Sequence, residues 1–335
     1  MTTNQQKLSK IVKTIIKEEI DFIKLKKAID DLNILFEEVS KIDTQKSSNK
    51  EHLYLKTGKA IGPKWAGMCV NDIMRTKRFI TGVYKAIKTK QQKKKNTPVC
   101  ILYAGTGPYA TLVMPLITLF QPNELQLILL EVNPNTIESL NNTIAALQAD
   151  NYIKEIHQCD AATFSISQNS QVDIVLIECL QHALRKEPQV AITYNLLSQL
   201  DKDVILIPEQ ISLQISLIDT AKKYNNSLDT SNTNRFDFYK TLETIFVLNK
   251  EEVLKNPSLV FPKVKVMLSE ENIEKYNLLA ITTDLIIFNE EKLTIDDSGL
   301  TIPFILSDLN NQKLKGIETQ YIINEHPEIE TTFIK

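Results

Sequence analysis

Apolar residues recur at every third or fourth position through the first part of the chain. Between Lys7 and Ile42 this spacing predicts two helices. The polar segment TQKSSNK, residues 44–50, then interrupts the pattern before a second helical stretch over residues 59–88. We therefore expect a helical amino-terminal region over residues 1–57.

After Pro98, short apolar segments alternate with helical ones. In chain order they are VCILYA, YATLVMPLITLF, LQLILLEV, NTIESLNNTIAALQ, IHQCD, VDIVLIE, QVAITYNLLSQL and DVILIP, with strands and helices taking turns. Continuous apolar strands are buried on both faces, and the intervening helices cover those faces. The fold class is therefore α/β, with a doubly wound parallel sheet of the Rossmann-like type in residues 58–207.

From Ile207 onward the pattern changes to strand-like runs. They are QISLQISLI, VKVMLS, LLAITTDLIIF, KLTI, TIPFIL, ETQYIIN and IETTFIK, which predict a mainly antiparallel second domain over residues 208–335. The segment Phe236–Leu254 has a helical pattern, and we place a helical insertion at about residues 221–257.

Charge and composition exclude some functions. The chain has 39 Lys and Arg against 41 Asp and Glu, so no overall field attracts nucleic acid or a membrane surface. The uncharged run 96–123 is long enough to span a bilayer, but its interior GTGP and Pro115 favour a strand, a turn and a buried helix. The first residues show no secretory signal, and we expect a cytoplasmic protein.

Cysteines and histidines are few and widely spaced. Metal sites need paired ligands at short spacing, which neither set offers, so we expect no metal and reduced, mostly buried thiols. The residues are Cys69, Cys100, Cys159, Cys179, His52, His157, His182 and His326.

The first predicted parallel strand ends in a glycine turn. Gly105 and Gly107 flank Thr106 there, and glycines at the carboxyl end of such a strand let a ligand approach the backbone. The third glycine of the dinucleotide fingerprint is replaced by Ala110, which weakens an NAD site without removing it.

Acidic residues follow the next two strands. Glu131 ends the second strand, where a carboxylate can accept both hydroxyls of a ribose, and Asp160 with Ala161 follows the third, where they can hold an adenine edge. Each acid alone is more often a helix cap or a surface charge. Together with the glycine turn they favour a nucleoside without a pyrophosphate, because no lysine or arginine for phosphate is nearby.

The fourth strand brings two more carboxylates to the same edge. Glu178 ends it, and the loop CLQHALRKE leads to Glu187, so the pair can clamp a cation. The alternative reading makes Glu187 a solvated loop residue beside Arg185 and Lys186.

These segments together resemble the protein arginine methyltransferase family, over about residues 72–301. The matching segments are DIMRTKRFITGVYKAI, LYAGTGPYA, LLEVNPNTIESLN, ECLQHALRKE and DVILIPEQISLQI, which resemble the family's first helix, glycine loop, ribose strand, double-glutamate loop and entry to its β-barrel. Their order and spacing agree with the family as well.

The resemblance implies the cofactor S-adenosyl-L-methionine and a β-barrel-like second domain. Gly105 and Gly107 would face the methionine part of the cofactor, Glu131 its ribose, and Asp160 with Ala161 its adenine. Arg75 would pair with the cofactor carboxylate, although Asp72, three residues earlier, is an alternative partner. Glu178 and Glu187 match the pair that holds a guanidinium, with Glu178 also assigned to the cofactor. The helical insertion resembles a dimerisation arm, which implies a homodimer.

The acceptor loop departs from the family. In this loop, residues 179–187, Cys179-Leu180-Gln181 replaces the usual Trp-Met-Gly. In a second loop, near residues 299–304, the family's usual Thr-His-Trp is missing. An acceptor other than arginine is therefore expected, and His182 is the candidate base for a hydroxyl or carboxylate.

The function expected from the sequence is methyl transfer to a nitrogen or oxygen of a peptide or a small amino or guanidino metabolite. Two alternatives stay open: a catalytically silent module that binds S-adenosyl-L-methionine, and an NAD-dependent oxidoreductase.

Overall fold

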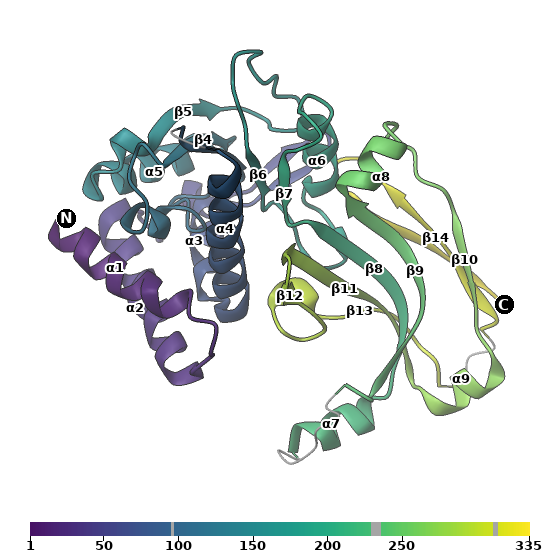
Figure 1. Cartoon of the computed structure of the whole chain (residues 1–335). Coiled ribbons are helices and arrows are strands. Elements are labelled where there is room, and N and C mark those ends of the chain that lie inside the picture. The colour runs from purple at the N-terminus through teal and green to yellow at the C-terminus, as the bar shows by residue number, and fades with distance from the viewer. Residues whose placement is uncertain (95–96, 229–235, 311–313) are drawn as a thin grey trace.

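A computed structural model describes residues 1–94, 97–228, 236–310 and 314–335. Its centre is a five-stranded parallel sheet in the order β5-β4-β3-β6-β7 (Figure 1). The strands are β3 (Val99–Ala104), β4 (Leu125–Glu131), β5 (Ile153–Gln158), β6 (Ile174–Ile177) and β7 (Ile205–Ile207). All six residues of the central strand β3 are buried. The predicted doubly wound parallel sheet is confirmed.

Helices, several of them short 3₁₀ helices, precede or connect the strands of this sheet. They are α4 (Ile73–Lys93), η3 (Met114–Thr118), α5 (Pro134–Ala146), η4 (Asp150–Tyr152), η5 (His182–Leu184) and α6 (Gln189–Leu197). The helix expected over residues 109–120 is wrong for most of its length, because turns and the short 3₁₀ helix η3 occupy the segment. Nearly all of its residues are buried, so the apolar run reflects burial on all sides and carries no helical period.

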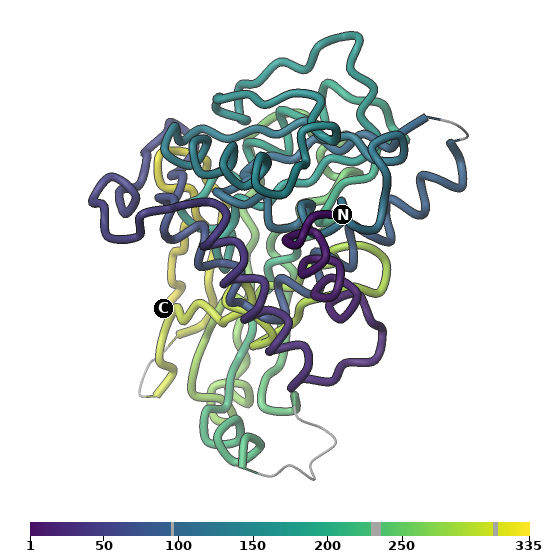
Figure 2. The backbone as a smooth tube through the Cα atoms, turned by 90° about the vertical axis from the view of Figure 1, so that its left-hand side faces the viewer, coloured from purple at the N-terminus to yellow at the C-terminus, as the bar shows by residue number. Residues whose placement is uncertain are grey.

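The amino-terminal region packs directly onto the parallel-sheet domain. Its elements are α1 (Thr3–Ile15), α2 (Phe22–Ser40), η1 (Ser47–Asn49) and β1 (Leu53–Leu55). The elements β2 (Gly58–Ala60), α3 (Pro63–Met68) and η2 (Cys69–Asn71) follow at the start of the next region. The two expected helices are confirmed, and Figure 2 shows them side by side. The antiparallel hairpin β1–β2 was not expected from the sequence.

Buried contacts hold these helices in place. The ammonium of Lys77 on α4 donates hydrogen bonds to the carbonyls of Ile15 (2.9 Å) and Lys17 (2.6 Å). These carbonyls lie at the carboxyl end of α1, where a positive charge stabilises the helix. The ring of Phe36 stacks on Tyr109 with centroids 5.2 Å apart. The region is therefore part of the main hydrophobic core.

The carboxy-terminal part is built from antiparallel strands. They are β8 (Gln210–Ile218), β9 (Tyr239–Asn249), β10 (Val264–Met267), β11 (Leu278–Phe288), β12 (Glu291–Leu293), β13 (Phe304–Asp308), β14 (Gly316–Ile322) and β15 (Glu328–Ile334). One sheet has the order β12-β11-β8-β9 with β13 also on β11, and a second has the order β10-β14-β15. Short helices connect them: α7 (Thr220–Leu228), α8 (Lys250–Lys255), α9 (Glu270–Lys275) and η6 (Gly299–Thr301). The barrel-like antiparallel fold is confirmed (Figure 1).

The helical insertion expected at about residues 221–257 is wrong over residues 239–249. The segment 239–249 is the long strand β9, which pairs with β8 along its whole length. Its Thr, Ile, Phe and Val residues favour an extended chain, and pairing with a neighbouring strand overrides the helical spacing. The helices α7 and α8 flank it, and residues 229–235 lie outside the described part of the chain.

A buried carboxylate joins the two domains. Glu291 on β12 accepts hydrogen bonds from Lys85 (2.6 Å) and Arg78 (2.9 Å) of α4, and these bonds lower its pKa against the effect of burial. No helix within the described residues is long and apolar enough to cross a bilayer.

Candidate active site

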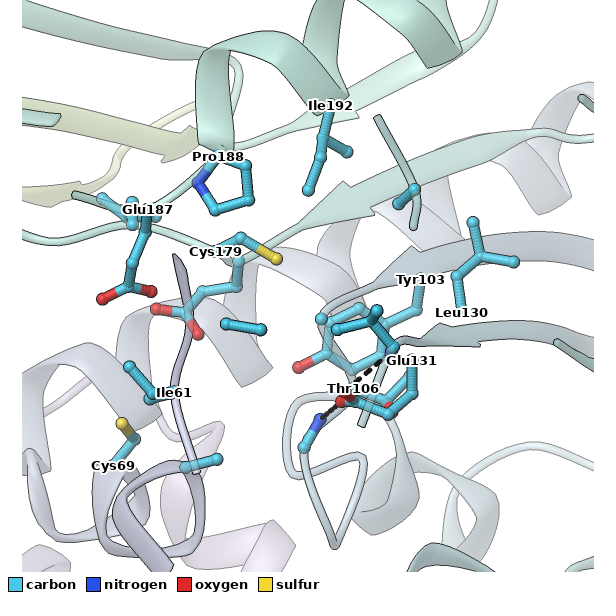
Figure 3. A pocket seen from close by; sticks show the side chains of 18 of the residues that line it. Ile61, Cys69, Tyr103, Thr106, Leu130, Glu131, Cys179, Glu187, Pro188 and Ile192 are labelled. Carbon is cyan, nitrogen blue, oxygen red and sulfur yellow. Dashed lines mark hydrogen bonds between the residues drawn. The ribbon is translucent and has the colours of Figure 1, made fainter. Parts of the chain in front are cut away.

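A cavity of about 250 Å³ opens at the carboxyl ends of β3, β4, β5 and β6 (Figure 3). Parallel α/β sheets bind ligands at this edge. All the site residues predicted from sequence except His182 line the cavity, namely Arg75, Gly105, Gly107, Glu131, Asp160, Ala161, Glu178 and Glu187. The structure thus brings together residues that are up to 112 positions apart in the chain, from Arg75 to Glu187.

Both loop glycines have positive φ angles, which favour glycine. Gly105 has φ of 79°, and a Cβ there would lie 2.3 Å from Cys179 Sγ and 2.8 Å from the carbonyl oxygen of Glu178. Gly107 has φ of 61°, which disfavours any residue with a side chain, although the space beside it is open. The loop can therefore pass close to the end of β6 only with glycine at the first position.

Glu131 organises the glycine loop. One carboxylate oxygen accepts the N–H of Gly107 (3.0 Å), and the other accepts those of Val132 (2.9 Å) and Asn133 (3.0 Å), as the dashed lines in Figure 3 show in part. Burial raises the pKa of this carboxyl, and the three amides oppose that effect. A carboxylate offers about four acceptor positions, so room is left for a ligand hydroxyl.

Asp160 and Ala161 line the cavity in the loop that follows β5. Asp160 accepts the N–H of Ala162 (2.9 Å), which fixes the turn, and the Asn195 amide donates to the carbonyl of Ala161 (2.9 Å). Asp160 lies two residues past the last residue of its strand, Gln158, so it belongs to the loop. Asn195, on α6, is a supporting residue that gave no signal in the sequence.

Arg75 and Glu178 form a buried ion pair. The guanidinium Nε donates to one Glu178 oxygen at 2.9 Å and Nη2 donates to the other, while Nη1 donates to the carbonyl of Cys69 (3.1 Å). The side chains are only 6% and 11% exposed. Asp72 does not pair with this guanidinium. It caps α4 by accepting the Arg75 N–H at 3.0 Å, so the alternative partner named from the sequence is wrong.

Glu187 points into the cavity (Figure 3). Burial and then the charge of Glu178 raise the pKa of this carboxyl to about 8, against the opposing charges of Lys59 and Arg75. The alternative of a solvated loop residue does not hold. Arg185, two residues earlier, is turned elsewhere and stacks on the Phe304 ring at 3.8 Å.

His182 is the predicted site residue that the structure does not bring to the cavity. Its half-buried ring packs near Phe304, with centroids 6.2 Å apart. Burial and then the charges of Arg185 and Lys186 lower its pKa. The geometry gives no support to His182 as a base acting on a ligand in this cavity.

Several lining residues were missed from the sequence. They include Lys59, Cys69, Tyr103 and Cys179. The backbone N–H of Cys179 is held by Gln189 (2.9 Å), and burial raises the pKa of the Cys69 thiol to about 11, so this thiol is not activated. Lys59 lies at the start of the helical stretch predicted over residues 59–88, but the structure places it on strand β2. No group of His, Cys, Asp and Glu within the described ranges is arranged to hold a metal ion.

Comparisons with known proteins agree with this architecture. No family model and no curated protein sequence matches the chain. A solved structure described as PRMT6-SAH is 10% identical, with 80% of this chain and 98% of that chain covered and a TM-score of 0.53. A second PRMT6 structure is 11% identical, with 79% and 97% covered and a TM-score of 0.52. At this level of identity the similarity concerns the fold, and the chain has the fold of the protein arginine methyltransferases, as its sequence segments suggested.

Proposed function

We propose that this protein is an S-adenosyl-L-methionine-dependent methyltransferase that acts on a nitrogen, or an oxygen, of a peptide or a small amino or guanidino metabolite. One observation carries the proposal. The glycine turn after β3 and the acids at the carboxyl ends of β4, β5 and β6 line a single cavity, which Glu187 also lines.

The cavity suits a nucleoside ligand. Glu131 keeps acceptor capacity for a ribose hydroxyl, Asp160 and Ala161 can face an adenine, and Gly105 with Gly107 can leave backbone open to the methionine part. A fold neighbour described as PRMT6-SAH supports the same choice of cofactor.

Methyl transfer from a sulfonium is an in-line displacement, and the cofactor supplies the methyl group. The protein must hold the acceptor lone pair in line with it and exclude water. Glu178 and Glu187 lie together at the cavity wall, where they can orient an acceptor N–H. Glu187 in its protonated form can give up its proton when a cation arrives, because an opposite charge lowers a carboxyl pKa.

A second candidate function is binding of the cofactor without turnover. The ion pair with Arg75 already neutralises Glu178, and burial favours the neutral form of Glu187. The cavity therefore lacks the two free negative charges that a guanidinium clamp needs.

NAD chemistry has less support. The turn after Gly107 leads to Ala110 with φ of 44° and then to a short 3₁₀ helix. The dinucleotide fingerprint needs the amino end of an α-helix for its pyrophosphate.

Turnover separates these functions. The protein is incubated with methyl-labelled S-adenosyl-L-methionine and a panel of arginine peptides, amines, guanidines and carboxylates, with Glu178→Gln as the matched variant. We expect label transfer that falls at least about 100-fold in Glu178→Gln, which equals about 2.7 kcal/mol of transition-state stabilisation. Tight calorimetric binding of S-adenosylhomocysteine without transfer to any acceptor would favour the silent module, and binding of NAD alone would refute the proposal.

We further propose a cytoplasmic homodimer that binds no nucleic acid or membrane. Helix α7 lies at the end of the β8–β9 pair, away from the parallel sheet (Figure 1), and exposes Tyr224 and Leu228 one turn apart. Light scattering at micromolar concentration should give twice the chain mass. The double variant Tyr224→Ser/Leu228→Ser should give the monomer, and a monomeric parent protein would refute the proposal.

A further inference from the structure

Most charged side chains of the cavity already have partners. Asp72 accepts the Ser298 hydroxyl (2.7 Å) and the Gly299 N–H (2.8 Å). The other partnered ones were described above: Arg75 with Glu178, Glu131 with three backbone amides, and Asp160 with the N–H of Ala162. Each of these groups therefore already has at least one partner within the protein.

Lys59 and Glu187 are the exceptions. Both line the cavity, and neither side chain has a hydrogen bond or a salt bridge to another described residue. No salt bridge joins these two described side chains, and the positive charge of Lys59 opposes the rise in the pKa of Glu187. The cavity thus presents one ammonium and one carboxyl group without partners.

The backbone fixes these two residues relative to each other. The N–H of Lys59 donates to the carbonyl of Lys186 at 2.7 Å. A Cβ on Gly58 would lie 2.9 Å from both the carbonyl carbon of Glu187 and the nitrogen of Pro188. The β1–β2 hairpin is therefore packed tightly against the acceptor loop, and the position of Lys59 is set by the fold.

We propose that the methyl acceptor is a zwitterion, a free amino acid or a chain end, whose carboxylate binds Lys59 and whose amine or guanidine faces Glu187. This inference rests on the proposed methyltransferase function and names its substrate class. An opposite charge at each end satisfies both unpartnered groups, and the ammonium gains a charge-assisted hydrogen bond.

The carboxylate has a second conceivable source, the methionine end of the cofactor. The placement of Lys59 favours the acceptor, because its backbone is bonded to the loop that carries Glu187 and its charge acts on that carboxyl. Gly105 and Gly107, which border the methionine end, lie on a different loop. The experiment below distinguishes the two sources.

The test is calorimetry on pairs of acceptors that differ by the carboxylate alone. L-Arginine is compared with agmatine, and L-ornithine with putrescine, on the protein saturated with S-adenosylhomocysteine and again on the free protein. We expect at least one carboxylate-bearing member to bind about 10-fold or more tightly than its decarboxylated partner. Lys59→Gln should remove that preference and leave S-adenosylhomocysteine affinity unchanged. Lys56→Gln, an exposed lysine in the turn of the same hairpin, is the matched control and should preserve the preference.

Three results would overturn the proposal: equal or weaker binding of every carboxylate-bearing member, a preference that survives Lys59→Gln, or a loss of S-adenosylhomocysteine affinity in Lys59→Gln that assigns the lysine to the cofactor. Failure of S-adenosylhomocysteine to bind the parent protein refutes the proposed function instead. The titrations on the free protein still decide the role of Lys59 in that case.

Discussion

Replacement of Arg75 by methionine tests the ion pair at the centre of the site. The substitution keeps an unbranched chain of similar length but removes the cation that faces Glu178, whose side chain is 11% exposed. It also removes the donor to the carbonyl of Cys69. A buried charge that loses its partner costs about 3–5 kcal/mol, so we expect Arg75→Met to lower the free energy of unfolding by about that amount.

The double variant isolates the pair. Arg75→Met/Glu178→Gln removes both charges, and replacement of a whole buried pair is often nearly neutral. We therefore expect the double variant to be more stable than Arg75→Met alone, with a coupling energy of about 2–3 kcal/mol. Denaturant unfolding at pH 7, followed by circular dichroism, measures all four proteins. A cost below about 1 kcal/mol for Arg75→Met, or additive effects in the double variant, would refute the description of this pair as buried and mutually dependent.

Three further perturbations act on neighbouring parts of the site. Gly105→Ala places a Cβ 2.3 Å from Cys179 Sγ at a φ of 79°, so we expect about 2–4 kcal/mol of destabilisation. Adding Cys179→Ala should relieve part of this loss. Thermal unfolding that shows no relief in the double variant would contradict the contact. Glu131→Gln loses part of the acceptor set that holds Gly107, so calorimetry should show at least about 10-fold weaker binding of S-adenosylhomocysteine, and unchanged binding would exclude this role. The pKa of Glu187 is raised from 4.5 to about 8, so between these pH values the native state keeps a proton that the unfolded chain releases. The free energy of unfolding should therefore fall by a few kcal/mol as pH rises from about 4.5 to 8. Glu187→Gln should flatten this part of the pH profile. An identical profile in both proteins would show that Glu187 is not the titrating group.

The fold could be predicted where the spacing of apolar residues in the sequence reflects their burial in the structure. Strands such as β3 and β4 are buried on both faces, and their unbroken apolar letters report that directly. The same signal failed over residues 109–120, because a segment buried on all sides shows no period by which to tell a helix from turns. It failed again at β9, whose extended form depends on pairing with β8, a partner that local sequence does not reveal.

The site was predictable at strand ends. Gly105 and Glu131 follow strands that the pattern locates, and the parallel topology then brings such ends to one edge. Residues that reach the cavity from outside the sheet are different. Lys59 arrives on a hairpin whose packing against the acceptor loop is tertiary, and Arg75 meets Glu178 across 103 positions of chain. His182 was chosen because it lies in the acceptor loop, but the local turn directs its ring to Phe304.

The electrostatics of the cavity also explain why the double-glutamate motif alone does not identify the acceptor. Two carboxylates favour a guanidinium only when both are ionised and unpaired, and here Arg75 is already bound to Glu178. That leaves Glu187 as the variable charge, and its pKa of about 8 makes its ionisation depend on what binds beside it. Because Lys59 is its uncommitted neighbour, a ligand that brings one positive and one negative group satisfies both residues. A ligand with a cation alone leaves the lysine without a partner in the cavity wall. Under the proposed function, acceptor selection in this protein would depend on the residues that surround the glutamates as much as on the glutamates themselves.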